Sequence, residues 1–284
     1  LGDKKSKTKI IESCSLTSSK FLVVGDSHAK EISKAVNIAT ESDCMLAKKS
    51  KDIGDSFLFS YKPFGKKGGK PSIEVQLIEP DLFISRAKKS DYTHIVISPY
   101  WLGFFAPEEN ALNSYDWVVR RHLSASGLKI KWDQALFKYV KSLKDLALSL
   151  EDTNFILIAP GPEFNWVGGG GLSELRTCEK QWFQLVVPPD ISQACALYAK
   201  PSIIERSYIE KRRSIIMEEL QKLDVQLENV YIFDPMPIIC EEKVCSTHDI
   251  KGERQYRDDD HLSSYGASKL APKLTEFLKD INSI

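Results

Sequence analysis

The chain has 284 residues, enough for one large domain or two small ones, and its hydrophobic share of 42% and charged share of 27% are ordinary for a globular protein. Lysine plus arginine equals aspartate plus glutamate at 39 each, so the formal net charge is zero. Nucleic acids and anionic membranes normally require a basic excess in their partners, so the composition argues against both. No apolar run approaches the roughly 18 residues that a membrane-spanning helix needs.

A single domain is expected, preceded by a short extension. Residues 1–19, which include a cluster of lysines, are predicted to be a linker or N-terminal extension, and residues 20–284 to form one domain. The chain begins at Leu1 without methionine and shows no charged-then-apolar signal region. We therefore interpret it as an excised fragment or a processed protein.

Apolar runs and helical periodicities alternate along the chain. The predicted strands lie at residues 20–25, 43–47, 93–98, 154–159 and 230–233. The predicted helices lie at residues 28–39, 133–150 and 202–223, and a last helix carries Leu270 and Ile281, with Pro272 expected to kink or restart it. Nearly continuous apolar strands that alternate with helices indicate an α/β fold with a parallel sheet of about five strands, covered on both faces.

Two long connections are predicted to border a functional cleft. Residues 99–130 and 160–200 follow the third and fourth strands, and ligands of parallel sheets bind beyond the carboxyl ends of the strands. Residues 50–72 are rich in glycine and are predicted to be a loop. The glycines and lysines at 65–72 lack the spacing of a phosphate-binding loop and do not join a strand to a helix, so that interpretation is excluded.

Two short segments at opposite ends of the chain supply a serine, an aspartate and a histidine. The tetrapeptide Gly-Asp-Ser-His follows the first strand and ends at His28, and Asp258 stands three residues before His261, just ahead of the last helix. Serine attack on an ester needs a base to take its proton and a carboxylate to orient that base. The candidate catalytic residues are therefore Ser27, Asp258 and His261.

The neighbours of these residues have simpler interpretations. Ser27 can also cap the helix that it precedes, and Asp26 is expected to hold the turn. Asp259 and Asp260 are interpreted as solvated neighbours of the orienting acid. Of the other histidines, His28 is expected to begin the helix and point away from Ser27, His94 to be a core residue, and His122 and His248 to lie in loops.

The six cysteines are interpreted as three local disulfides. Six cysteines allow 15 pairings, and proximity along the chain favours Cys14–Cys44, Cys178–Cys195 and Cys240–Cys245. Disulfides would indicate an oxidising compartment. The alternatives are six reduced thiols in a cytosolic enzyme, or a zinc site built from Cys240, Cys245 and His248, which lacks an obvious fourth ligand.

The pair of motifs resembles the SGNH hydrolase superfamily, also called GDSL esterases. Its first block is matched here by Gly25-Asp26-Ser27, and its last block, Asp-x-x-His, runs from Asp258 to His261. The resemblance implies a three-layer α/β/α sandwich, and a catalytic domain over residues 20–284. It also implies an oxyanion hole made of the Ser27 backbone N–H, a second-block glycine, for which Gly54 is the candidate, and a third-block asparagine. No asparagine follows the third strand, where the chain reads Ser98-Pro99-Tyr100-Trp101.

Further features look like the SGNH domains fused behind the multi-span membrane domain of acyltransferase-three proteins. These features are an aromatic residue after the third strand, the proline-rich segment 160–164, the short loop between Cys240 and Cys245, and the histidine of Gly-Asp-Ser-His. The resemblance implies acetyl transfer to a hydroxyl of a bacterial surface polysaccharide such as O-antigen, at the periplasmic face of the inner membrane. It implies an N-terminal membrane domain as partner, acetyl-coenzyme A as the ultimate donor through that domain, and neither a metal nor a tightly bound cofactor.

Two other functions remain open at this point. A secreted esterase would use the same three residues with water as acceptor, and a carbohydrate-binding module would carry a degenerate site, which the missing asparagine favours. The aromatic residues Tyr100, Trp101, Phe104 and Phe105 are candidates for stacking on sugar rings, or for packing within the loop.

Overall fold

The structure is a computed structural model that describes residues 20–25, 27–40, 60–61, 73–74, 80–102, 132–164 and 201–282. Four parallel strands form its central sheet. The strands are β1 (Phe21–Gly25), β4 (His94–Ser98), β5 (Asn154–Ile158) and β7 (Val230–Phe233), hydrogen-bonded in the order β1-β4-β5-β7. Each lies where the sequence predicts a strand, and the predicted strand at 43–47 lies outside the described residues.

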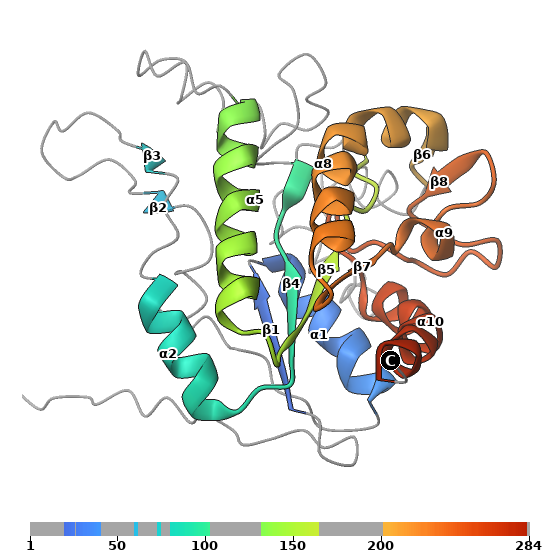
Figure 1. Cartoon of the computed structure of the whole chain (residues 1–284). Helices are drawn as coiled ribbons and strands as arrows, with labels where there is room; N and C mark the ends of the chain where they lie inside the picture. Colours follow the sequence, from blue (N-terminus) through green and yellow to red (C-terminus); the bar gives the residue numbers. More distant parts are fainter. Residues whose placement is uncertain are drawn as a thin grey trace, which may run out of the picture.

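Helices cover both faces of this sheet (Figure 1). On one face, α1 (Ser27–Ala39) and α10 (Ser264–Asn282) share a core with Phe21 and Val23 of β1. On the other face, α2 (Pro80–Ser90), α5 (Trp132–Ser149) and most of α8 (Arg206–Gln226) pack on Leu22 and Val24. Successive strand residues point to opposite faces and are apolar on both, which accounts for the continuous hydrophobic runs. The three-layer α/β/α fold is confirmed.

Shorter elements depart from the sequence prediction. β2 (Ser60–Tyr61) pairs with β3 (Ile73–Glu74), so part of the predicted loop at 50–72 is a short strand. α2 was not predicted. The helix predicted from 202 begins at Arg206, because β6 (Ile203–Glu205) pairs instead with β8 (Val244–Ser246) beyond α9 (Met236–Ile239). Pro272 lies within a single helix, α10, and does not start a new one.

Two glycines allow the backbone to come close at the ends of β1 and α10. Gly25 has a φ of +152°, and a Cβ there would lie 2.2 Å from the carbonyl oxygen of Ser98. A Cβ on Gly266 would lie 2.1 Å from the carbonyl oxygen of Gln255. A side chain at either position would collide with backbone that cannot move cheaply. Glycine therefore positions both the start of α1 and the segment that leads to Asp258.

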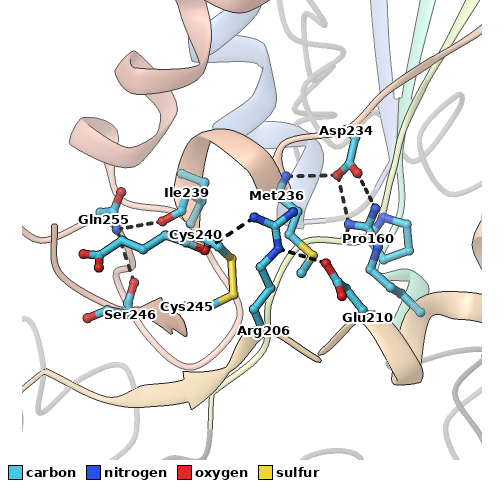
Figure 2. The surroundings of a disulfide bond; sticks show 12 residues. Pro160, Arg206, Glu210, Asp234, Met236, Ile239, Cys240, Cys245, Ser246 and Gln255 are labelled. Atoms are coloured by element: carbon cyan, nitrogen blue, oxygen red, sulfur yellow. Dashed lines mark hydrogen bonds and ion pairs between the residues drawn. A yellow bond between two sulfur atoms is a disulfide. The ribbon is translucent and has the colours of Figure 1, made fainter. Parts of the chain in front are cut away.

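A disulfide between Cys240 and Cys245 closes the loop between α9 and β8, as the sequence predicts. Figure 2 shows Gln255 beside it, donating its side-chain amide to the carbonyl oxygens of Ile239 at 3.2 Å and Ser246 at 3.3 Å. The bridge thus supports the segment three residues before Asp258. Because both sulfurs are bonded to each other, the zinc interpretation is wrong. The pairs Cys14–Cys44 and Cys178–Cys195 lie outside the described residues.

Replacing both Cys240 and Cys245 by serine should lower the free energy of unfolding by about 2 kcal/mol, because a short closed loop restricts the unfolded chain only modestly. Urea denaturation followed by circular dichroism measures the change. The single variant Cys240→Ser breaks the same bond and should lose as much. Unchanged denaturation midpoints in both variants would contradict a stabilising role.

Candidate active site

A cleft of about 60 Å³ lies at the carboxyl edge of the sheet. Residues that follow each of the four strands line it, together with the loop before α10. The described parts of the two long connections, 99–102 and 160–163, both border this cleft, as predicted. Carboxyl ends of parallel strands meet at one edge, so four segments distant in sequence converge here.

Asp258 holds His261 within the same short loop, which we call the His261 loop (residues 258–261). His261 Nδ1 lies 2.9 Å from Asp258 Oδ1, and that oxygen also accepts the His261 backbone N–H at 2.7 Å. The three-residue spacing lets the carboxylate fold back over its own loop. Ser263 then caps α10, because its hydroxyl accepts the Gly266 backbone N–H at 2.9 Å.

Asp260 is not the solvated neighbour that the sequence suggested. Its side chain is only 10% exposed, and its Oδ1 lies 2.5 Å from His261 Nδ1. Its other oxygen lies 3.7 Å from His28 Nε2. Two of the three consecutive aspartates therefore face the same imidazole, because the loop folds around His261.

His28 joins the two motif segments. Its ring stacks on His261 with ring centroids 4.4 Å apart and on Tyr100 with centroids 4.7 Å apart. His28 is the residue after Ser27, so this contact brings the first residue of α1 into the neighbourhood of His261. The side chain of Ser27, and all of Asp26 and Gly54, lie outside the described residues. The contact between Ser27 and His261 therefore stays a prediction.

A second connection links α1 to the His261 loop. Arg257 donates from Nε to Asp258 Oδ2 at 3.4 Å and from Nη1 to Glu31 Oε1 at 3.2 Å. Glu31 is 2% exposed and also accepts from Lys34 Nζ at 2.5 Å. Sequence reasoning missed this pair, because nothing local to Glu31 or Arg257 indicates a partner at the other end of the chain.

The carboxylates strongly bias the charge of His261. Burial favours the neutral form of His261. The hydrogen bonds that the carboxylates of Asp258 and Asp260 accept from it outweigh burial and raise the pKa of His261 well above the ordinary 6.5. Burial likewise opposes the charge of Asp258, yet its contact with His261 holds its pKa well below the ordinary value. Burial and the charges of its two aspartate neighbours raise the pKa of Asp259 to about 7.

Arginines of α8 support one wall of the cleft. Arg212 and Glu163 form an ion pair at 2.9 Å in which both side chains are buried. Arg213 donates to the carbonyl oxygen of Pro160 at 2.7 Å and pairs with Asp234, next to the disulfide region (Figure 2). Removing one partner of a buried ion pair is costly, so these contacts should hold the segment after β5 in place.

Aromatic residues after β4 have different surroundings. Trp101 is 3% exposed and donates its indole N–H to the carbonyl oxygen of Ile158 at 2.6 Å. Of its two interpretations, packing is the one that fits this burial. Tyr100 is also buried, against His28. Phe104 and Phe105 lie outside the described residues. Ser98, where the superfamily's asparagine was sought, lines the cleft.

His94 has the surroundings of a core residue. His94 is buried in β4, with Nδ1 2.9 Å from the Thr93 hydroxyl, as predicted for a core residue.

His28, Asp260 and His261 each offer a possible metal-ligand atom, all within 4.8 Å of one another. In the structure the two rings stack on each other and Asp260 approaches a nitrogen of each.

Comparisons with known proteins give one family. A family model described as "SGNH domain (fused to AT3 domains)" matches residues 2–276. A solved structure, "Structure of Salmonella ser. Paratyphi A lipopolysaccharide acetyltransferase periplasmic domain", is 14% identical over 91% of this chain and 82% of that one, with a TM-score of 0.44. No curated protein matches the sequence. Within the described residues, every helix is too short or too polar to cross a lipid bilayer.

His261 should titrate well above pH 6.5 in the folded domain. A raised folded-state pKa stabilises the fold below pH 6.5, and that contribution is lost as the pH rises through the folded value. Proton NMR of the histidine ring resonances, assigned with His261→Gln, measures the titration. His248 provides an internal control, because burial and the nearby Arg254 lower its pKa. A His261 pKa at or below 6.5 would contradict the arrangement of its carboxylate partners.

Proposed function

Because the chain belongs to the family of SGNH domains fused to AT3 domains, we propose that its site transfers an acyl group. The proposed group is acetyl, and the proposed acceptor is a hydroxyl of a bacterial surface polysaccharide such as O-antigen. Ser27, His261 and Asp258 are the proposed catalytic residues. The observation that carries the proposal is the stacking of His28 on His261, at 4.4 Å between ring centroids. It places the residue after the serine beside a histidine that is already held by an aspartate.

The proposed reaction proceeds through an acyl-serine. Ser27 Oγ attacks the acyl carbon while His261 Nε2 takes its proton, and that proton passes to the leaving group. The sugar hydroxyl then attacks the acyl-serine, and His261 takes the hydroxyl proton and returns it to Ser27. Asp258 fixes the tautomer with the proton on Nδ1 and stabilises the imidazolium that forms in each step.

The start of α1 suits the negative charge that develops on the acyl oxygen. Ser27 is the first residue of a 13-residue helix, where unpaired backbone N–H groups and the helix dipole favour anions. In the proposal, the Ser27 N–H is one oxyanion donor and Gly54 supplies a second. The segment that directly follows β4 reads Ser98-Pro99-Tyr100-Trp101 without an asparagine, so the third donor of the superfamily is not carried over to this chain.

The size of the cleft favours a small acyl group. Its volume of about 60 Å³ corresponds to roughly four or five water-sized spheres. Apolar side chains in its lining include Ile32, Ile158 and Leu262. An acetyl group has three non-hydrogen atoms and would fit such a space.

The proposed setting is the periplasmic face of the bacterial inner membrane, with an AT3 membrane domain as partner. The family description supports fusion to AT3 domains, and the disulfide between Cys240 and Cys245 is of the kind that persists in oxidising compartments. Acetyl-coenzyme A would supply the acetyl group through the membrane domain, and no tightly bound cofactor is proposed for this chain.

Ser27→Ala in the full-length protein should reduce acetyl transfer to polysaccharide by at least about a thousandfold, because the nucleophile is lost. The measurement compares incorporation of labelled acetyl groups into polysaccharide with hydrolysis of an activated acetyl ester by the same preparations. Ser149→Ala, which removes an exposed hydroxyl at the end of α5, is the matched control and should keep most of the transfer activity.

Two results would replace the proposal. Rapid ester hydrolysis by the present chain alone, abolished by Ser27→Ala and without transfer to sugar, would establish a secreted esterase. Transfer that survives Ser27→Ala would remove Ser27 from the reaction and leave a carbohydrate-binding role.

A further inference from the structure

The His261 loop presents two carboxylates to one imidazole N–H, although a Ser-His-Asp arrangement needs only one. Asp258 Oδ1 and Asp260 Oδ1 lie 2.9 Å and 2.5 Å from His261 Nδ1. One N–H cannot point straight at two oxygens, so the two carboxylates share it or alternate. The closer of the two belongs to the residue that the Asp-x-x-His spacing does not mark.

The two aspartates have different additional partners. Asp258 Oδ1 also accepts the backbone N–H groups of Asp260 at 3.3 Å and His261 at 2.7 Å, so it holds the loop as well as the ring. Asp260 instead extends its second oxygen to within 3.7 Å of His28 Nε2. Asp258 therefore ties His261 to its own loop, and Asp260 ties it to the helix that begins at Ser27.

A nearly buried carboxylate needs partners, because burial of an unpaired charge is costly. The side chain of Asp260 is 10% exposed, and the two stacked imidazoles face it. The carboxylates of Asp258 and Asp259 and the buried Tyr256 are also close enough to feel its charge. His28 is in turn stacked on Tyr100, which the end of β4 holds in place. The position of Asp260 thus depends on α1, on β4 and on the His261 loop together.

We propose that Asp260 is a positioning residue of the active site, one that shares the His261 Nδ1–H with Asp258 and couples the His261 ring to His28 at the start of α1. The proposal rests on the function proposed above, because it assigns His261 the role of base. Holding Nδ1 from two carboxylates leaves Nε2 as the nitrogen available to Ser27. Asp260 acts on the reaction through His261 and takes no proton from the substrate.

Other charged groups lie around His261 and help to choose a control variant. Arg257 contacts Asp258 through the oxygen that does not face His261, and Arg257 also pairs with Glu31. Asp259 lies between the two aspartates in sequence, and burial and their charges raise its pKa to about 7. The two carboxylates at hydrogen-bond distance from His261 Nδ1 belong to Asp258 and Asp260, and Asp259 lies between them in the same loop. Asp259→Asn is therefore a matched control for the loss of a carboxylate at Asp260.

The first experiment measures the His261 titration by NMR in the domain that carries Asp258→Asn, Asp259→Asn or Asp260→Asn. Loss of an opposite charge in contact should lower the pKa of His261 by about one or more, so Asp260→Asn should show this fall and Asp259→Asn a clearly smaller one. Asp260→Ser serves as a second variant should the asparagine disturb the fold. Equal pKa values in the Asp259 and Asp260 variants would overturn the proposal.

The second experiment records the pH dependence of acetyl transfer by the full-length protein. His261 must be neutral to act as a base, so the acid limb of kcat/KM should move about one pH unit lower in Asp260→Asn. The plateau value of kcat/KM should fall about tenfold, and KM for the acyl donor should stay unchanged. The double variant with Asp258→Asn should lose more than the product of the two single effects, since either aspartate alone can hold the ring. An unmoved acid limb would contradict the positioning role.

The two experiments separate this proposal from the proposed function. The NMR titration reports the hold of Asp260 on His261 whether or not the domain transfers acetyl groups. If Ser27→Ala leaves transfer intact, the function fails while the titration still decides the contact. If transfer depends on Ser27 but the titration is insensitive to Asp260, the function stands and the role of Asp260 is rejected.

Discussion

The contact between His28 and His261 depends on close packing of two helices from opposite ends of the chain. α1 and α10 lie side by side on one face of the sheet (Figure 1). Small residues form much of their buried surfaces, namely Ala29, Ala35 and Ala39 in α1 and Ala267 and Ala271 in α10. Short side chains let the two backbones approach, and the ring stack, the Glu31–Arg257 pair and the Lys34–Ser264 hydrogen bond all cross this junction.

Three consecutive aspartates in a mostly buried loop would repel one another strongly if nothing compensated their charges. Three features compensate these charges. His261 pairs with the carboxylates of Asp258 and Asp260, and Arg257 pairs with the second oxygen of Asp258. The pKa of Asp259 is raised to about 7, so its carboxyl group is largely protonated at lower pH. Each feature lowers the negative charge of the loop. The acidic character of the sequence therefore does not become a large local charge around the base.

Local patterns in the sequence were sufficient for the central sheet and for the pairing of Asp258 with His261. Apolar runs located all four strands of the central sheet, and the Asp-x-x-His spacing predicted the contact of Asp258 with His261, because the carboxylate reaches back over three residues. His28 and the Glu31–Arg257 pair could not be found this way, since their partners come from distant segments. Asp260 was missed because the Asp-x-x-His spacing does not show how the loop folds around His261. The start of α8 was misplaced because Ile203–Glu205 has a strand partner forty residues later that periodicity cannot reveal.

Within the proposed reaction, the same contacts bear on the choice between a sugar and water as acceptor. His28 stacks on His261 and Tyr100 stacks on His28, so aromatic rings keep solvent from one face of the base. A histidine held by two carboxylates is a stable imidazolium, and that form arises as Ser27 or the acceptor loses its proton. The cost is a smaller fraction of neutral base at pH 7. A site built in this way favours a hydroxyl that binding energy brings to Nε2 of the ring over water that meets it by chance.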